Sequence, residues 1–271
     1  MNIHTTQEEF DNFLRELASS QDYQYKLLRH EITEAVQGRS IFYDGSLLNV
    51  QGESWILIIH SGALLVYGNN WSKNQFEEIK ESFDLTKFTN YLMTGDSSLI
   101  KALLEFYEIN NFQIEMERLF YKTTSINIFG SNDLRIIPAN EKDINILAAM
   151  LQQYYHEEYE GENDKTIEDM VSRVRQCIFN GTMFVLENLK GDILSFCTII
   201  DPDIGIFFTN TEFRKKGYGK IILSYCADLL LQRNAEVYLM TVKSKVDSNT
   251  ACRGVGFEPY FEYSYIRINN S

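Results

Sequence analysis

The part of the sequence best suited to bind an anion is the stretch Phe208-Thr-Asn-Thr-Glu-Phe-Arg-Lys-Lys-Gly-Tyr-Gly-Lys220. It places four cationic side chains and two glycines within thirteen residues. Gly217 and Gly219 allow the backbone to approach an anion without an intervening side chain. A helix is expected from about Gly219 to Gln232, and the N–H groups at a helix N-terminus are unpaired and electropositive. The pattern therefore indicates a site for a phosphate or pyrophosphate group.

Two better-known glycine motifs do not fit this stretch. A dinucleotide-binding fingerprint requires a third glycine three residues after Gly219, where the sequence has Ile222. A P-loop requires glycine at the position of Arg214 and Ser or Thr at the position of Ile221. A plain helix start, with its charges facing solvent, remains the alternative to an anion site.

Length and composition limit the other classes of protein. With 271 residues, 44 % of them hydrophobic, the chain can form two domains of about 130 residues each. A net charge of −13 disfavours nucleic-acid binding, which requires an electropositive face, and is compatible with an amine substrate. No signal peptide and no apolar run of about 20 residues is present, so we expect a soluble, cytoplasmic protein with no membrane partner. The four cysteines have no CxxC spacing, which predicts neither disulfides nor a metal site.

The expected elements fall into two halves, which we assign to domains 1–125 and 132–271. In the first half, two helices precede β-like runs at 41–50 and 54–68, and a strand, a helix from Ser97 to Tyr107 and a strand follow. In the second half the order is a strand, two helices, a β-hairpin, a strand at 204–209, the basic loop, a helix and a strand ending at Val242. Both halves are of the α/β (α+β) class.

The order of the second half, together with its loop, resembles the GNAT superfamily (GCN5-related N-acetyltransferases). The matching features are Arg214-x-x-Gly-x-Gly after an apolar strand, a helix and strand after it, and a Gly256-Phe257 pair behind a short helix containing Asn249. The resemblance covers about residues 132 to 270, and the first half looks like a degenerate GNAT-like lobe. It implies two GNAT-like lobes, each a mixed, mostly antiparallel sheet flanked by helices, and acetyl-CoA or another acyl-CoA as co-substrate.

The resemblance also implies positions for the coenzyme. Backbone groups of Phe207, Phe208 and Thr209 would bond the pantetheine arm, and Asn249 would either reach the pantetheine or cap a helix. The pyrophosphate would lie on the loop and the helix start, that is, on Arg214, Lys215, Lys216, Gly217, Tyr218, Gly219 and Lys220.

Catalytic groups are less clear, because many members of the superfamily use a tyrosine as general acid where this sequence has Cys252. Cys252 is either that acid or a buried packing residue. Asp203 and Glu187 are candidate bases, acting directly or through water, or else solvated strand-end carboxylates. The acidic, tyrosine-rich segment 154–169 is either a rim that attracts an ammonium group or an exposed loop, and His156 within it is a further candidate base.

Three functions follow from these patterns. The first is transfer of an acyl group to a small amine or peptide amine, by an enzyme that could be a homodimer. The second is a non-catalytic, acyl-CoA-binding regulatory or interaction protein, which the missing tyrosine and the degenerate first half favour. The third is an α/β module whose loop binds nothing.

Overall fold

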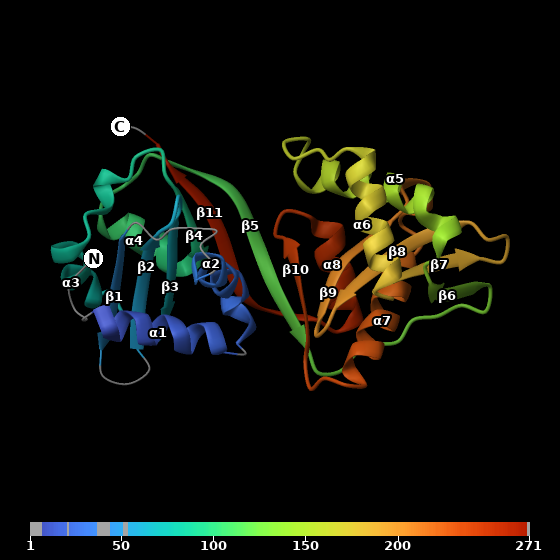
Figure 1. The fold of residues 1–271 in the computed structure, drawn as a ribbon, viewed down its shortest axis with the longest axis horizontal. Helices are drawn as coiled ribbons and strands as arrows, with labels where there is room; N and C mark the ends of the chain where they lie inside the picture. The colour runs from blue at the N-terminus through green and yellow to red at the C-terminus, as the bar shows by residue number, and fades with distance from the viewer. Residues whose placement is uncertain (1–6, 21, 37–43, 51–53, 270–271) are drawn as a thin grey trace. The chain divides into compact units, whose positions relative to one another are not determined.

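The computed structural model describes residues 7–20, 22–36, 44–50 and 54–269. The chain forms two compact units (Figure 1), one of Met1–Leu119 with Phe261–Ser271 and the other of Phe120–Tyr260. Two long strands, β5 (Phe112–Thr123) and β11 (Glu258–Ile268), have residues in both units. No helix in the described ranges is long and apolar enough to cross a membrane.

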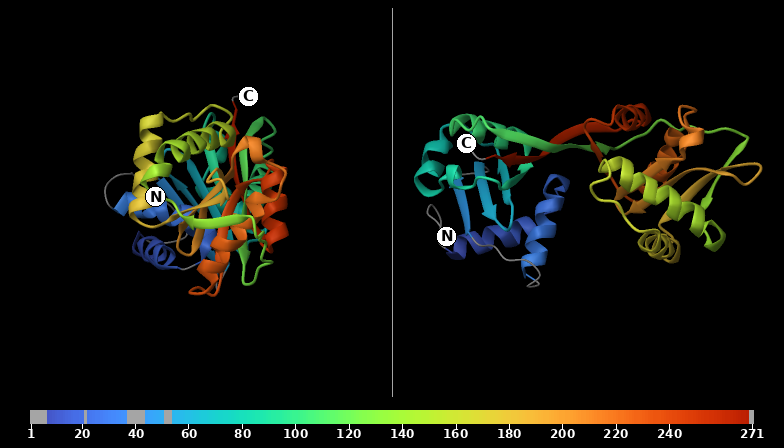
Figure 2. Two further views of the ribbon diagram at one scale, coloured as in Figure 1. Left: turned by 90° about the vertical axis from the view of Figure 1, so that its right-hand side faces the viewer. Right: turned by 90° about the horizontal axis from the view of Figure 1, so that it is seen from above.

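The first unit is a mixed sheet with helices on both faces. Its strands lie in the order β1-β2-β3-β4-β11-β5, antiparallel except for the parallel pair β3 and β4. Figure 2 shows these helices on the two faces of the sheet. Side chains alternate between the faces of a strand, so Trp55 and Tyr67 face α1 and α2 while Ile56 and Val66 face α3 and α4. The elements are α1 Gln7–Ser19, α2 Lys26–Val36, β1 Asp44–Val50, β2 Ser54–His60, β3 Leu64–Asn69, α3 Gln75–Ser82, β4 Leu92–Asp96 and α4 Ser97–Phe106.

The second unit has the same kind of architecture. Its strands lie in the order β10-β9-β8-β7-β6, and only β10 and β9 are parallel. Val185 packs in the core formed with α5 and α6, whereas its neighbour Phe184 contacts Tyr225 of α7, so these helices cover opposite faces. The elements are β6 Leu134–Pro138, α5 Ile144–Glu158, α6 Ile167–Phe179, β7 Met183–Asn188, β8 Ile193–Ile200, β9 Asp203–Thr209, α7 Tyr218–Leu231, β10 Val237–Val242 and α8 Val246–Val255.

The expected fold class is confirmed, and the units differ from domains 1–125 and 132–271 in their last strand. β11 pairs antiparallel with β4, where Tyr263 lies opposite Asp96, and Phe261–Ser271 therefore belongs to the first unit. The prediction placed this strand in the second domain because it follows the second half in sequence. Pairing between strands more than 150 residues apart leaves no local sequence signal.

Cysteines and potential metal ligands are placed as follows. All four cysteines carry free thiols, and Cys197, Cys226 and Cys252 are buried in the second unit. Within the described part of the chain, no group of three or more His, Cys, Asp or Glu side chains is arranged to hold a metal ion.

Candidate functional site

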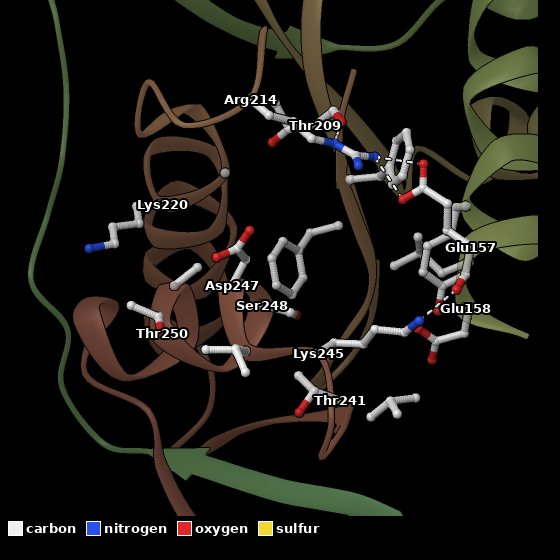
Figure 3. A pocket seen from close by; sticks show the side chains of 18 of the residues that line it. Glu157, Glu158, Thr209, Arg214, Lys220, Thr241, Lys245, Asp247, Ser248 and Thr250 are labelled. Carbon is white, nitrogen blue, oxygen red and sulfur yellow. Dashed lines mark hydrogen bonds and ion pairs between the residues drawn. The ribbon is translucent and has the colours of Figure 1, made fainter. Parts of the chain in front are cut away.

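The second unit contains a cavity of about 660 Å³ at the C-terminal ends of β9 and β10. It is lined by residues 205–209 of β9, residues 240–242 of β10, the basic loop, the end of α5 and the start of α8 (Figure 3). A volume of this size falls within the range of small-molecule sites.

The cavity exists because two neighbouring strands diverge. β9 and β10 are adjacent in the sheet, yet their parallel pairing is limited to Asp203 and Tyr238 at the start of each strand. On its other edge β9 is fixed to β8, where the Ser195 hydroxyl donates to the Phe208 carbonyl at 2.7 Å. The other edge of β9, from Gly205 to Thr209, thus lines the cavity.

The basic loop turns into α7 through two residues in the left-handed region, Lys215 at φ +62° and Gly217 at φ +83°. In the described chain, the first amide of this helix with an acceptor is that of Lys220, which donates to the Gly217 carbonyl at 3.0 Å. A Cβ atom built on Gly217 meets nothing within 4 Å, so the position is open. The N–H groups ahead of Lys220 are consequently available to a ligand, at the positive end of the helix dipole.

The cationic side chains of the loop are directed mainly at other protein groups. Arg214 donates through Nε to the Thr209 carbonyl at 3.1 Å and through Nη2 to both carboxylate oxygens of Glu157. Lys216 lies over the Phe213 ring at 5.5 Å, and Lys220 lies over the Phe129 ring at 5.8 Å. The main-chain amides are therefore the loop's better candidates for binding an anion.

Most residues predicted to hold the coenzyme line this cavity, and two do not. Those that line it are Phe207, Phe208, Thr209, Arg214, Lys215, Gly217, Tyr218, Gly219 and Lys220. Lys216 and Asn249 are not among the lining residues.

Asn249 is buried, and its carboxamide is bonded within the protein. Its oxygen accepts from Tyr121 at 3.0 Å and Thr241 at 2.5 Å, and its Nδ2 donates to the carbonyls of Val242, Lys243 and Lys245. It lies inside α8, whose N-cap residue is Lys245. The structure thus gives Asn249 neither of its two predicted roles, and the side chain instead fixes the turn between β10 and α8.

The three predicted catalytic residues also lie away from the cavity walls. Asp203 is buried at the start of β9, and Glu187 is buried on β7 in an ion pair of 2.7 Å with Arg135. Cys252 is buried in α8, and burial raises the pKa of its thiol to about 12. The geometry assigns Glu187 and Cys252 to packing and leaves the cavity's own polar groups as candidates for catalysis.

The polar groups that line the cavity outside β9 and the basic loop come from the end of α5 and from the stretch that runs from the end of β10 into α8. Tyr154, Glu157 and Glu158 belong to the acidic segment that the sequence indicated as a substrate rim. Sequence reasoning missed the polar lining residues from the end of β10 into α8, although the polar run after β10 was a possible signal. These residues are Thr241, Ser244, Lys245, Asp247, Ser248 and Thr250. His156 does not line the cavity, and its Nδ1 lies 3.0 Å from the Asp164 carboxylate.

Acidic side chains of α5 and basic side chains of the loop and of the start of α8 lie together along one side of the cavity (Figure 3). Glu157 and Glu158 extend from α5 toward Arg214 and Lys245. Lys245 donates to the backbone carbonyl of Glu157 at 2.8 Å, which ties the start of α8 to the end of α5. Tyr154 lies near the C-terminal end of β9, with its ring edge-on to Phe208 at 6.2 Å.

Comparison with solved structures identifies the fold. No protein-family model matches the sequence, and no curated protein matches it either. An acetyltransferase of the GNAT family from Colwellia psychrerythraea is 12% identical, with a TM-score of 0.55 over 98% of this chain and 97% of that one. A GCN5-related N-acetyltransferase from Sphaerobacter thermophilus is 13% identical, with a TM-score of 0.52 over 83% of each chain. The chain has the fold of these proteins across both units.

The corresponding place in the first unit is filled. There β3 and β4 pair in parallel at three positions, and a Cβ on Gly95 would lie 1.9 Å from the Val66 carbonyl oxygen. A Cβ on Gly68 would meet Trp71 at 2.9 Å and Leu99 at 3.0 Å. In the first unit, close backbone contact and packed side chains therefore fill the position between β3 and β4. The corresponding position in the second unit, between β9 and β10, is open.

Proposed function

We propose that this chain, which has the GNAT fold, is a cytoplasmic, acyl-CoA-dependent N-acyltransferase with acetyl-CoA as donor and a small amine or peptide amine as acceptor. The observation that carries the proposal is the cavity at the divergence of β9 and β10, which the glycine-containing loop closes at one end. In the same proposal the partners include neither nucleic acid nor membrane, and a homodimer is possible.

The second unit fits the coenzyme in shape and chemistry. A pyrophosphate would accept hydrogen bonds from the N–H groups of residues 215–219, where the open position of Gly217 leaves room for it. The pantetheine arm would run along the free edge of β9 at Phe207, Phe208 and Thr209. The coenzyme would supply the acyl group as a thioester, whose carbonyl is open to attack by an amine.

The side of the cavity formed by the end of α5 is the proposed acceptor site. Glu157 and Glu158 would attract an ammonium group, and the amine must lose a proton before it forms the new C–N bond. Glu158 lines the cavity on this side, and we assign the role of proton acceptor to its carboxylate. The thiolate that leaves as the C–S bond breaks must be protonated, and Tyr154, beside Phe208 of β9, is the proposed donor.

A thiol-release assay with acetyl-CoA over a panel of primary amines tests this function. Wild type should release free thiol with at least one amine. Glu158→Gln and Tyr154→Phe should each lower kcat by about 100-fold while the Kd of acetyl-CoA changes by less than about threefold. Glu168→Gln, which removes a carboxylate from an exposed position on α6, is the matched control and should retain full turnover.

The second candidate is a protein that binds acyl-CoA without turning it over. The position of Cys252 favours it, because the buried thiol does not line the cavity where a general acid would be required. Coenzyme binding with no thiol release from any amine in the panel would support this second function and contradict the first.

A further inference from the structure

The first unit contains a separate cavity, of about 330 Å³, between α2 and the sheet. It is bounded by the turn between β2 and β3 and by β3, β4 and β11, all within this unit. The side chains that matter to its chemistry are those of His30, Glu31, Tyr67, Thr94, Tyr263 and Tyr265. It lies on the sheet face that α2 covers, over the strands β3, β4 and β11.

An unsatisfied hydroxyl marks this cavity. Tyr67 is 1% exposed, and its Oη has the Tyr263 hydroxyl as a neighbour but makes no hydrogen bond of standard geometry within the described residues. Burial, and after it the neighbouring Tyr263, raises the pKa of Tyr67 well above the ordinary value, so the phenol stays neutral. Buried polar groups in folded proteins nearly always have a partner, and a ligand is one way to supply it.

The charge of the cavity wall is negative. Glu31 contributes a carboxylate, and neither a lysine nor an arginine is among the lining residues. No hydrogen bond or ion pair joins Glu31 to another residue within the described chain. Its charge contributes, after burial and neighbouring tyrosines, to the raised pKa of Tyr67 and of Tyr263, which places it close to both phenols.

Aromatic faces complete the wall. The Tyr67 and Tyr263 rings have centroids 6.2 Å apart and are inclined at 58°, and the Tyr263 and Tyr265 rings are 5.1 Å apart at 59°. Rings inclined to one another present both faces and edges to the same space. Such faces attract cations, most strongly when a carboxylate is near.

We propose that this cavity binds a small organic ammonium ion. The Glu31 carboxylate would balance the charge, the tyrosine faces would surround the cationic head, and the Tyr67 hydroxyl would bond a polar group on the ligand. An anion would be repelled by Glu31, and a purely apolar ligand would leave Tyr67 without a partner. The site belongs to the unit whose β3–β4 gap is filled, so it is independent of the coenzyme site.

Titration of the full chain with choline, followed by ligand NMR, tests the proposal. The control ligand is 3,3-dimethyl-1-butanol, which has the same shape and hydroxyl but no charge. Choline should bind with a Kd of about 1 mM or tighter, and the neutral isostere should bind at least about tenfold more weakly. A second probe, n-butylammonium, shows whether a primary ammonium is accepted as well.

Two variants locate the binding. Glu31→Gln should weaken choline binding by about tenfold and Tyr67→Phe, which keeps the ring, by about threefold, both with unchanged far-ultraviolet circular dichroism. Glu158→Gln, in the other cavity, should leave choline affinity within about twofold of wild type. The proposal is overturned if neither choline nor n-butylammonium binds at about 10 mM, which is tenfold above the expected Kd. It is also overturned if the neutral isostere binds equally well, or if Glu158→Gln rather than Glu31→Gln removes binding.

Discussion

Glu157, at the end of α5, accepts hydrogen bonds from the Arg214 guanidinium with both carboxylate oxygens, at 3.0 and 2.9 Å. Both side chains are 37% exposed, and the pair connects α5 to the basic loop along the wall of the cavity. The loop's first cation is thus already neutralised in the absence of a ligand. An incoming anionic coenzyme and the Glu157 carboxylate would compete for the same guanidinium.

This competition predicts that Glu157→Gln increases the affinity for coenzyme A. The change removes one negative charge from the cavity and frees Arg214, so the Kd should fall by about two- to fivefold, as for a single exposed ion pair. Arg214→Gln should raise the Kd by a similar factor. Calorimetric titration measures both, and Glu168→Gln on exposed α6 controls for net charge. A weaker affinity in Glu157→Gln would contradict the competition.

Gly217 should be required for coenzyme binding because of its place beside the loop amides. Its positive φ alone should not account for the effect. Gly217→Asp places a carboxylate at the open position ahead of the loop amides and should weaken coenzyme A binding by more than about tenfold. Gly181→Asp is a close match, since Gly181 has φ +65°, also meets nothing within 4 Å, and lies at the end of α6. Both variants should lose about 1 kcal/mol of stability. Equal loss of coenzyme affinity in the two would argue against a loop site.

Cys252 should influence stability at high pH and leave catalysis unchanged. Its pKa is raised by burial from 9.0 to about 12 in the folded protein, so the folded state retains a proton that the unfolded chain loses. The contribution to the free energy of unfolding is therefore present below pH 9 and decreases as the pH rises toward 12.

The comparison of wild type with Cys252→Ala isolates this contribution. Urea unfolding at a series of pH values should show the advantage of wild type over Cys252→Ala shrinking above pH 9. The pH profile of thiol release should be the same for both proteins. If the rate of thiol release no longer fell at high pH in Cys252→Ala, Cys252 would again be a candidate for the general acid.

Glu187 should stabilise the second unit and contribute nothing to turnover. Its buried carboxylate pairs with Arg135 on the adjacent strand, so Glu187→Gln should lower the free energy of unfolding by about 1–3 kcal/mol. Arg135→Gln leaves that carboxylate without its cation and should cost at least as much. Both should retain kcat within about twofold. A stable Glu187→Gln variant without activity would restore the residue as a candidate base.

The site's location could be predicted from the sequence because its signals are local. The turn into α7 needs a residue that accepts a positive φ, and Gly217 supplies it. The hairpin of β7 and β8 forms around a short turn with Gly191 at φ +87°, and α6 ends at its C-cap Asn180, followed by Gly181 at φ +65°. Each of these features depends on residues within about five positions of one another.

The chemical groups of the site could not be predicted in the same way. Residue spacing alone does not show which carboxylate faces a cavity. Glu187 forms an ion pair with Arg135, whereas Glu158, 29 positions earlier, lines the cavity wall. Asn249 looked free to bond a ligand or cap a helix, yet backbone carbonyls around residues 242–245 use its amide. These partners come from the tertiary fold and leave no pattern in the sequence.

The measurement that tests the account most directly is calorimetric titration of the full chain with acetyl-CoA. The open gap between β9 and β10 and the filled gap between β3 and β4 predict one equivalent bound, with a Kd in the micromolar range (about 1–100 μM). Gly217→Asp should weaken that binding by more than about tenfold. Absence of binding by the folded wild type, or two equivalents bound per chain, would contradict the account.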